Sequence, residues 1–354
     1  MYPPHPKEQL SNCPRRDLTN GGTMKRSGIS QIEVLATLGM ICVLLSLLLP
    51  AIQSARESSR RTQCLTRLRS LGQASATHES IHGRFPAAYN GQLAPGSRHQ
   101  LMLSPHVMLL PFLGQQPLFQ KINKTEDGLG AGSFPATSAT NPAALSIPLA
   151  DFVCPSDQVP RAGNSYRACA GSTPQMHETT GIGDKEARVG IICGQSRGSA
   201  ARQVVDGLSQ TILFSEKSVG DFDEQSFTPW RDFFFAGGDF KFPDDALVGC
   251  QLMQGIEPEH VSTAGASWLF AGYGHTLYNH VSTPNSRVPD CASGRPDGEN
   301  PGGGAFSARS LHRDLVHVVF GDGAARGVSQ QIDLKVWRAL SSRHGKGEIV
   351  VSDY

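Results

Sequence analysis

Two short motifs have the residue types and spacing of catalytic or metal-binding sites. Residues 78–82 read His-Glu-Ser-Ile-His, a pattern in which two histidines four apart on one helical face hold Zn²⁺ while the glutamate acts as a base. Residues 194–198 read Gly-Gln-Ser-Arg-Gly, the pattern of a hydrolase nucleophile elbow. We interpret the first motif as a helix end and the second as a Gly/Ser loop. A hydrolase that uses His78, His82 or Ser196 is the less favoured alternative.

The sequence has neither a phosphate-binding motif nor a basic surplus. It contains no Gly-Lys-Ser/Thr phosphate loop and no Gly-x-Gly-x-x-Gly. The 354 residues include 32 basic and 31 acidic side chains, for a formal net charge of +1. Because counterion release from nucleic acid requires clustered Lys and Arg, this balance argues against a nucleic-acid partner. We predict a non-enzymatic protein.

The cysteines fit an oxidising exterior. The closest pair is fifteen residues apart, so no Cys-x-x-Cys motif exists. Cys13 lies near the N-terminus and Cys42 in an apolar run. Six cysteines remain, which allow up to three disulfides with fifteen connectivities: Cys64, Cys154, Cys169, Cys193, Cys250 and Cys291. Buried free thiols are the alternative.

One apolar segment predicts a membrane helix. Residues 34–49 carry no charge, and extending the run back to Ile29 adds only Glu33. These 21 residues reach roughly 31 Å as a helix, about the thickness of a bilayer core. The mean hydropathy of −0.25 excludes a multi-span protein. We expect Pro50 to end or kink this helix, since proline lacks an N–H.

The residues before the apolar segment specify the kind of span. Residues 24–28 read Met-Lys-Arg-Ser-Gly, and Glu33 lies five residues after Gly28. This arrangement resembles the class III signal of type IV prepilins and pseudopilins, although Ile29 replaces the usual Phe and Gln31 a usual apolar residue. The resemblance implies cleavage after Gly28 by a prepilin peptidase, methylation of Ile29, and pairing of Glu33 with the amino terminus of a neighbouring subunit.

A second resemblance covers nearly the whole remaining chain. The motifs, in order, are LLLPAIQSARESSRRTQCLTRLRSLGQASATHESIHGRFPAAY, HVMLLPFLGQQPLFQ, FVCPSD, SYRACAG, VVDGLSQTILFSEK and HVVFGDGAARGVSQQIDLKVWRAL. They resemble the bacterial prepilin-type family known as domain of unknown function 1559, which ends in a His-x9-Asp-Gly signature. The signature corresponds here to His312, Asp322 and Gly323. The family's Pro-Gly-Gly turn after the histidine is replaced by residues 313–315, Arg-Asp-Leu.

The physical interpretation of this signature is a β-hairpin. Residues 315–320 form an apolar strand, Gly321-Asp322-Gly323 tolerates positive φ, and residues 325–328 return as a second strand. The alternative pairs His312 with Asp322 as a metal site or as a base and its orienter. A calcium loop is a further alternative because carboxylates lie nearby: Asp290, Asp297, Glu299 and Asp314.

Beyond Pro50 the pattern stays helical and becomes amphipathic. Apolar and small residues recur mostly every three or four positions: Ile52, Ala55, Ser59, Leu65, Leu68, Leu71 and Ser75. Arginines occupy the other faces, where they contact lipid headgroups or solvent: Arg56, Arg60, Arg61, Arg67 and Arg69. Residues 83–86, Gly-Arg-Phe-Pro, end the helix.

Together these features predict an α+β fold, with a long N-terminal helix packed on a mainly antiparallel β-rich domain with long loops. The expected segments are a leader (1–28), a transmembrane helix (29–52), a stalk helix (53–84) and an extracytoplasmic domain (85–354). The resemblances imply a pilin-like subunit of the inner membrane or secretion apparatus. Its partners would be prepilin peptidase, membrane lipid and other pilin-like subunits, and calcium is the one cofactor considered. The alternative function is a tethered binding protein for a small ligand or calcium.

Overall fold

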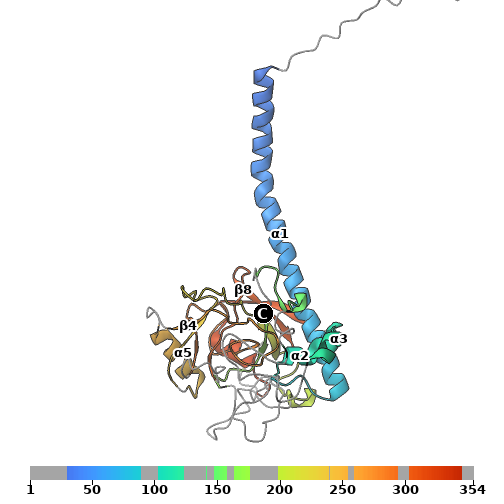
Figure 1. Ribbon diagram of the computed structural model, residues 1–354, viewed down its shortest axis with the longest axis vertical. Helices are drawn as coiled ribbons and strands as arrows, with labels where there is room; N and C mark the ends of the chain where they lie inside the picture. The colour runs from blue at the N-terminus through green and yellow to red at the C-terminus, as the bar shows by residue number, and fades with distance from the viewer. Residues whose placement is uncertain are drawn as a thin grey trace, which may run out of the picture. The chain divides into compact units, whose positions relative to one another are not determined.

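A computed structural model describes residues 30–88, 103–122, 141, 147–157, 163–175, 198–238, 240–253, 259–293 and 303–344. Figure 1 shows its helices and strands. The chain divides into two compact units, Met1–Ser54 and Ala55–Tyr354. Gly28 and Ile29, at the expected cleavage site, lie outside the described residues, as do Cys193 and Ser196.

The described part of the first unit is the beginning of α1 (Gln31–His82), a helix of 52 residues. The large apolar side chains of this first part are exposed, and no residue in the most apolar 18-residue window of α1 is buried. By length and composition α1 can serve as a membrane span or signal anchor. Of the two outcomes expected at Pro50, an end or a kink, the first is wrong, because Pro50 lies within α1. A proline removes one helical N–H bond, and here the turns on either side continue without it.

In the second unit, α1 buries one face and ends where the sequence predicts. Its buried residues are Cys64, Leu68, Leu71, Gly72, Ala74 and Ser75. Gly83 follows with φ +71°, a left-handed conformation that favours glycine at a helix C-terminus. The short helices α2 (Pro105–Leu109) and α3 (Gln116–Lys121) lie beside these last turns of α1 (Figure 1). The other helical segments are η1 (Leu110–Leu113), η3 (Ala150–Phe152), η5 (Ala201–Gln203), α5 (Pro243–Leu252) and α6 (Leu334–Ala339).

Two sheets form the rest of the second unit. The five-stranded sheet has the order β5-β1-β2-β8-β9, and the four-stranded sheet has the order β4-β3-β6-β7. The strands of the first are β1 (Tyr166–Cys169), β2 (Ile212–Glu216), β5 (Leu277–Tyr278), β8 (Leu315–Phe320) and β9 (Ala325–Ser329). Those of the second are β3 (Phe233–Phe235), β4 (His260–Val261), β6 (Asp290–Ala292) and β7 (Gly304–Ala305). The pairings β1·β5 and β3·β6 are parallel, whereas the other five are antiparallel.

The central strands carry the core. All residues of β1 and β2 are buried, so these strands lack the alternation of a half-exposed strand. Phe214 of β2 belongs to the same apolar cluster as Leu68 and Leu71 of α1. β8 and β9 form an antiparallel hairpin whose register pairs Leu315 with Ser329 and Val319 with Ala325. Glu216, at the end of β2, is therefore enclosed between α1 and the hairpin strand.

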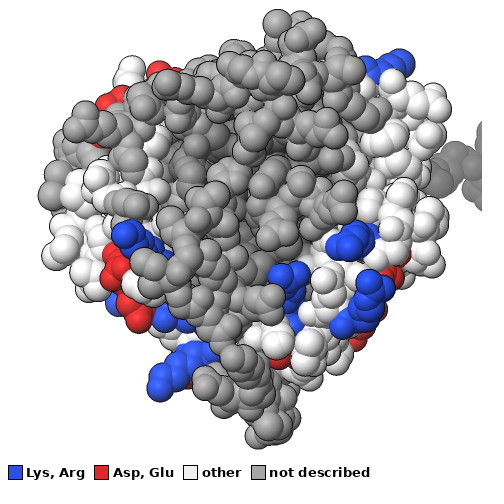
Figure 2. All heavy atoms as spheres, turned by 90° about the horizontal axis from the view of Figure 1, so that it is seen from below, with Lys and Arg blue, Asp and Glu red and all other residues white. Residues whose placement is uncertain are grey.

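The α+β prediction is confirmed, since a long apolar helix precedes a sheet-rich domain. Figure 2 shows one face of the molecule, on which the basic and acidic side chains of the described residues are interspersed. This distribution agrees with the formal net charge of +1.

Candidate functional site

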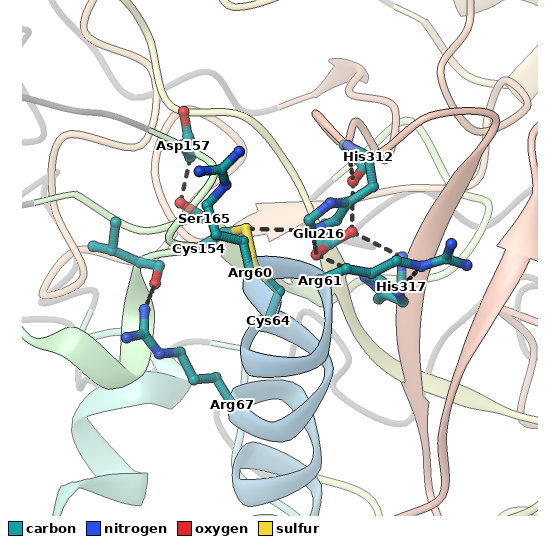
Figure 3. The surroundings of a disulfide bond; sticks show 12 residues. Arg60, Arg61, Cys64, Arg67, Cys154, Asp157, Ser165, Glu216, His312 and His317 are labelled. Atoms are coloured by element: carbon teal, nitrogen blue, oxygen red, sulfur yellow. Dashed lines mark hydrogen bonds and ion pairs between the residues drawn. A yellow bond between two sulfur atoms is a disulfide. The ribbon is translucent and has the colours of Figure 1, made fainter. Parts of the chain in front are cut away.

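A disulfide fastens α1 to the loop that follows η3. Cys64 on α1 is bonded to Cys154, with the two Cα atoms 5.2 Å apart. Both residues are buried, although Cys154 keeps 5% of its surface exposed. Figure 3 shows that His312 and Glu216 point toward this disulfide from other parts of the chain. We call Glu57, Cys64, Cys154, Glu216, His312 and His317 the histidine cluster.

His312 lies between two carboxylates. Its Nδ1 donates to Oε1 of Glu57 on α1, 2.8 Å away. Its Nε2 faces Oε1 of Glu216 at 3.4 Å and Sγ of Cys154 at 3.6 Å. The histidine therefore joins the end of β2 to α1 through its two ring nitrogens.

Four interactions with the residues before and within β8 fix the Glu216 carboxylate. Oε2 accepts hydrogen bonds from the Ser310 hydroxyl at 2.7 Å and from the His317 backbone N–H at 2.9 Å. Oε1 accepts from His317 Nδ1 at 3.0 Å, besides facing His312. Arg61 donates its Nε–H to His317 Nε2 at 3.4 Å, so Nδ1 is the protonated nitrogen of that ring.

The charges of the cluster reinforce one another. Burial opposes ionisation of Glu216, but hydrogen bonds from His312 and His317 outweigh it and lower the pKa of Glu216 to about 2. Burial likewise opposes protonation of His312, yet Glu216 and Glu57 raise the pKa of this imidazole. Partial burial is also outweighed at Glu57, whose pKa is lowered by His312 and Arg60. The two carboxylates thus favour the protonated form of His312, whose Nε2 faces Glu216 Oε1 and Cys154 Sγ.

Arginines of α1 surround the cluster (Figure 3). Arg60 pairs with Glu57 at 2.8 Å, and Arg67 donates to the carbonyl of Val153 next to the disulfide. With Arg61 on His317, three of the arginines expected on the outer faces of the helix make contacts within the second unit, and Arg61 remains exposed. They give the cluster a cationic border on the helix side.

Glu216 and its neighbour Lys217 enter different buried clusters. Lys217 pairs with Asp290 at the start of β6 and donates to the Ser307 carbonyl at 2.8 Å. Asp290 also pairs with Arg309 Nη2 at 2.9 Å. Lys217, Asp290 and Arg309 are all buried, and we call them the lysine cluster. It joins the end of β2 in one sheet to β6 in the other.

Asp322 is not a partner of His312 in this arrangement. Its exposed side chain accepts from the backbone N–H of Ala324 at 2.9 Å in the β8–β9 turn. The neighbouring Gly323 has φ +83° and packs against Gly72 on α1, where a Cβ would lie 3.1 Å from the Gly323 Cα. His312 and Gly323 therefore contact α1 at Glu57 and Gly72, fifteen residues apart and roughly 22 Å along the helix.

The histidines of the His-Glu-x-x-His motif have structural contacts. His78 Nδ1 donates to the Arg84 carbonyl at 2.8 Å, and His82 Nδ1 donates to the His78 carbonyl at 3.0 Å. Glu79 accepts from the backbone N–H of Ala201 at 3.1 Å. Burial is the main reason that the pKa of His78 is lowered. These bonds close the end of α1 and connect it to η5.

The acidic residues considered for calcium do not converge in the described residues. Asp290 belongs to the lysine cluster, whereas Asp314 is exposed and accepts from Gln330 Nε2 at 3.3 Å. Asp297 and Glu299 lie outside the described residues.

Four of the six candidate cysteines form two disulfides. Besides Cys64–Cys154, Cys250 of α5 is bonded to Cys291 of β6. Cys169 is a buried free thiol whose pKa burial raises to about 12. The other free cysteine within the described ranges is Cys42, on the exposed apolar part of α1.

Sequence reasoning missed Glu57 and Glu216. The available signal was the sequence ILFSEK, in which two charged residues directly follow an apolar strand. Such a pair is ordinarily a solvated strand end. Only the tertiary structure shows that Glu216 and Lys217 are buried.

The fold and site define an α+β protein with an N-terminal apolar helix and a disulfide-linked domain. Residues 53–335, more than half of the chain, match the family described as Protein of unknown function (DUF1559), and the chain belongs to that family. No curated protein and no solved structure matches it. The match includes every member of the histidine and lysine clusters.

Proposed function

We propose that this chain is a prepilin-like or pseudopilin-like protein, cut after Gly28, methylated at Ile29 and anchored in the inner membrane as a surface or secretion-apparatus subunit. The observation that carries the proposal is α1 itself. The same helix has an apolar part without buried residues and, further along, a face packed into the second unit. A pilin-like subunit requires an apolar part and a packed face in one helix, because that helix anchors the subunit in the membrane and also supports its domain.

The position of Glu33 supports an assembly role. It lies in the first turn of α1, where its carboxylate accepts from the Ser30 backbone N–H at 2.9 Å. An acidic group in hydrocarbon costs about 2.5 kcal/mol or more on translocon scales, so it requires a partner. In this proposal the partner is the methylated amino terminus of a neighbouring pilin-like subunit.

The proposed role is non-enzymatic and uses no resident cofactor. This proposal is supported by the hydrogen bonds and ion pairs that the polar side chains form within the histidine cluster and within the lysine cluster. The proposed partners are prepilin peptidase, membrane lipid, and other pilin-like subunits or secretion machinery. The interspersed charges in Figure 2 give no support for nucleic acid as a partner.

Mass spectrometry of the membrane-bound protein tests the processing. The full chain is expressed in a host with a prepilin peptidase, and the mature N-terminus is expected to be N-methylated Ile29. Gly28→Leu places a bulky side chain at the cleavage position and should retain the leader, whereas Ser27→Ala is the matched control. A wild-type chain that begins elsewhere, or that is found in the soluble fraction, would refute the proposal.

Cross-linking tests the assembly role separately. Glu33→Gln should leave membrane association intact and reduce cross-links between α1 helices of adjacent subunits. Ser30→Ala, which retains the carboxylate, is the control. Equal cross-linking in wild type and Glu33→Gln would refute the assembly role of Glu33, and the proposal that α1 anchors the protein in the membrane would stand.

A further inference from the structure

The histidine cluster contains the ligand set of a zinc site, partly occupied by a disulfide. One ligand atom each from Cys64, Cys154, Glu216 and His312 can be chosen so that all four lie within 4.8 Å of one another. All four residues are buried. Two thiolates, an imidazole and a carboxylate are ligand types that Zn²⁺ takes in tetrahedral sites.

We propose that reduction of the Cys64–Cys154 disulfide converts this cluster into a tetrahedral Zn²⁺ site, with Cys64, Cys154, Glu216 and His312 as the four ligands. The site therefore has two states, a disulfide under oxidising conditions and a metal centre under reducing ones. This inference does not depend on the proposed pilin-like function.

The orientation of His312 supports the proposal. Its Nδ1 donates to Glu57, which fixes the ring so that Nε2 faces Glu216 Oε1 and Cys154 Sγ. A carboxylate on the far nitrogen of a ligating histidine is the usual outer-shell arrangement of zinc sites, because it sets the tautomer and increases the basicity of the ligating nitrogen. The metal ion would take the place of the Nε2 proton.

Glu216 is held in a position suited to coordination. Oε2 is occupied by Ser310 and by the His317 backbone, which leaves Oε1 toward His312 and the sulfurs. Tetrahedral zinc with Zn–S bonds of about 2.3 Å holds two sulfurs roughly 3.8 Å apart. On reduction the two sulfurs must therefore move apart from bonding distance, whereas the imidazole and carboxylate atoms, already within 4.8 Å of the sulfurs, need to shift only modestly.

The surrounding charge suits such a centre. Zn²⁺ with two thiolates and one carboxylate carries a net charge of −1. Arg60 and Arg61 on α1 lie next to Glu57 and His317, where they can offset that charge. Figure 3 shows the side chains of both arginines extending from α1, with Arg61 reaching His317.

The conversion balances in electrons and protons. A dithiol reductant transfers two electrons to the S–S bond and becomes a disulfide, while Cys64 and Cys154 each become a thiol. Zn²⁺ then displaces the two thiol protons into solvent and binds the Nε2 lone pair of the neutral imidazole, whose Nδ1 keeps its proton toward Glu57. An imidazolium releases its Nε2 proton at the same step, and the oxidation state of zinc does not change. Cys154 keeps 5% of its surface exposed and lines a small pocket together with Glu216.

Metal analysis of the full-length chain in detergent tests the proposal. The oxidised protein, and protein reduced with excess phosphine under nitrogen, are each incubated with ZnCl₂ and desalted, and zinc is counted by plasma mass spectrometry. We expect about one zinc ion per reduced chain and less than about a tenth of that per oxidised chain. With Co²⁺ in place of zinc, the reduced protein should show thiolate charge-transfer and tetrahedral ligand-field bands.

The second disulfide provides a matched control. The double variant Cys250→Ser/Cys291→Ser should retain the zinc, because within the described residues no comparable group of ligands includes those cysteines. Cys64→Ser/Cys154→Ser should lose it. Zinc in the reduced wild type at or below the level of Cys64→Ser/Cys154→Ser, or equal zinc in the oxidised and reduced wild type, would overturn the proposal.

His312→Ala separates a folded site from adventitious binding by free thiols. An unfolded reduced chain would bind zinc through any cysteine and histidine, so the loss of one imidazole among 12 would change little. The proposed site should lose zinc affinity at least about tenfold on His312→Ala and change its Co²⁺ spectrum. An unchanged affinity and spectrum in His312→Ala would overturn the proposal even if the wild type binds metal.

Discussion

The end of β2 supplies one buried side chain to each of two clusters that differ in chemistry. Glu216 enters the histidine cluster and Lys217 the lysine cluster, since successive side chains of an extended chain point to opposite faces. The histidine cluster joins the five-stranded sheet to α1. The lysine cluster joins the same sheet to β6 of the other sheet. Both clusters therefore connect elements that share no backbone ladder with β2.

Their difference lies in what each can exchange. The lysine cluster consists of two cations on one carboxylate, and Arg309 adds hydrogen bonds to the carbonyls of Ser286 and Val288 at 2.7 and 2.8 Å. Each of these charges is paired within the lysine cluster, and removal of one partner would leave a buried charge without a counter-charge. The histidine cluster adds sulfur and imidazole, which can exchange protons, electrons and metal ions. The two clusters therefore differ in the ligand atoms that they contain.

The largest expected effect comes from the disulfides, one of which belongs to the histidine cluster. In the chain-entropy model, bridges across sequence separations of 90 and 41 stabilise by about 4.6 and about 3.9 kcal/mol. Cys64→Ser/Cys154→Ser should therefore lose slightly more free energy of unfolding than Cys250→Ser/Cys291→Ser. Denaturant unfolding of the oxidised full-length protein in detergent measures both. A larger loss at Cys250–Cys291 would show that α1 depends less on its bridge than we infer.

Removing the carboxylate of the lysine cluster should cost nearly as much. Asp290→Asn leaves Lys217 and Arg309 buried without a counter-charge, which costs about 3–5 kcal/mol of unfolding free energy. Asp314→Asn is the matched control, because Asp314 is exposed and asparagine tolerates its φ of +62°. A loss near zero for Asp290→Asn would mean that the cluster does not hold the two sheets together.

Local patterns predicted the elements but not these clusters. The apolar period and the glycine at 83 predict α1 and its end, because both signals lie within a few residues of the structure they specify. The same holds for the hairpin around Gly321-Asp322-Gly323. Pro50 shows the limit of such rules, since one breaker does not end a helix supported on both sides.

The candidate site depends on contacts between distant residues. His312 bonds to Glu57, 255 positions earlier, and its sequence context contains no trace of that partner. The alternative pairing of His312 with Asp322 relied on proximity in sequence, whereas Asp322 bonds locally within the turn. Charged residues at a strand end are ordinarily solvated, so the burial of Glu216 and Lys217 becomes visible only once α1 and β6 cover them.

A buried histidine outside both clusters predicts that stability falls at acid pH. His106 donates its Nε2–H to the Tyr166 carbonyl at 2.6 Å, while its Nδ1 has no partner. Burial lowers the pKa of His106 to about 4. The native pKa lies below the unfolded value of about 6.5, so stability is complete above pH 6.5 and is lost as the pH falls toward 4.

By pH 4 the difference between the native and unfolded pKa values of His106 lowers the free energy of unfolding by about 3 kcal/mol. His106→Gln keeps a donor for the Tyr166 carbonyl and should flatten the fall in stability between pH 6.5 and 4. The exposed His82→Gln should leave the slope unchanged. Identical slopes in wild type and His106→Gln would show that His106 does not contribute to the acid sensitivity.

The smallest effect is expected at Glu57, the half-exposed member of the histidine cluster. Its side chain is 42% exposed, and His312 retains Glu216 when Glu57 is neutralised. Glu57→Gln should therefore cost only about 1 kcal/mol of unfolding free energy, far less than Asp290→Asn. The contrast follows from burial, because solvent can replace the lost partner at Glu57 and cannot at Asp290.

The same substitution should act more strongly on the chemistry of His312 than on stability. Glu57 is one of the two carboxylates that raise the pKa of His312, so Glu57→Gln should lower that pKa toward its ordinary value. Histidine-selective NMR titration of the oxidised protein measures it, with the exposed Glu224→Gln as control. A His312 pKa that does not move would mean that Glu216 alone sets the protonation of the cluster, and that α1 contributes its disulfide and packing but no electrostatic control.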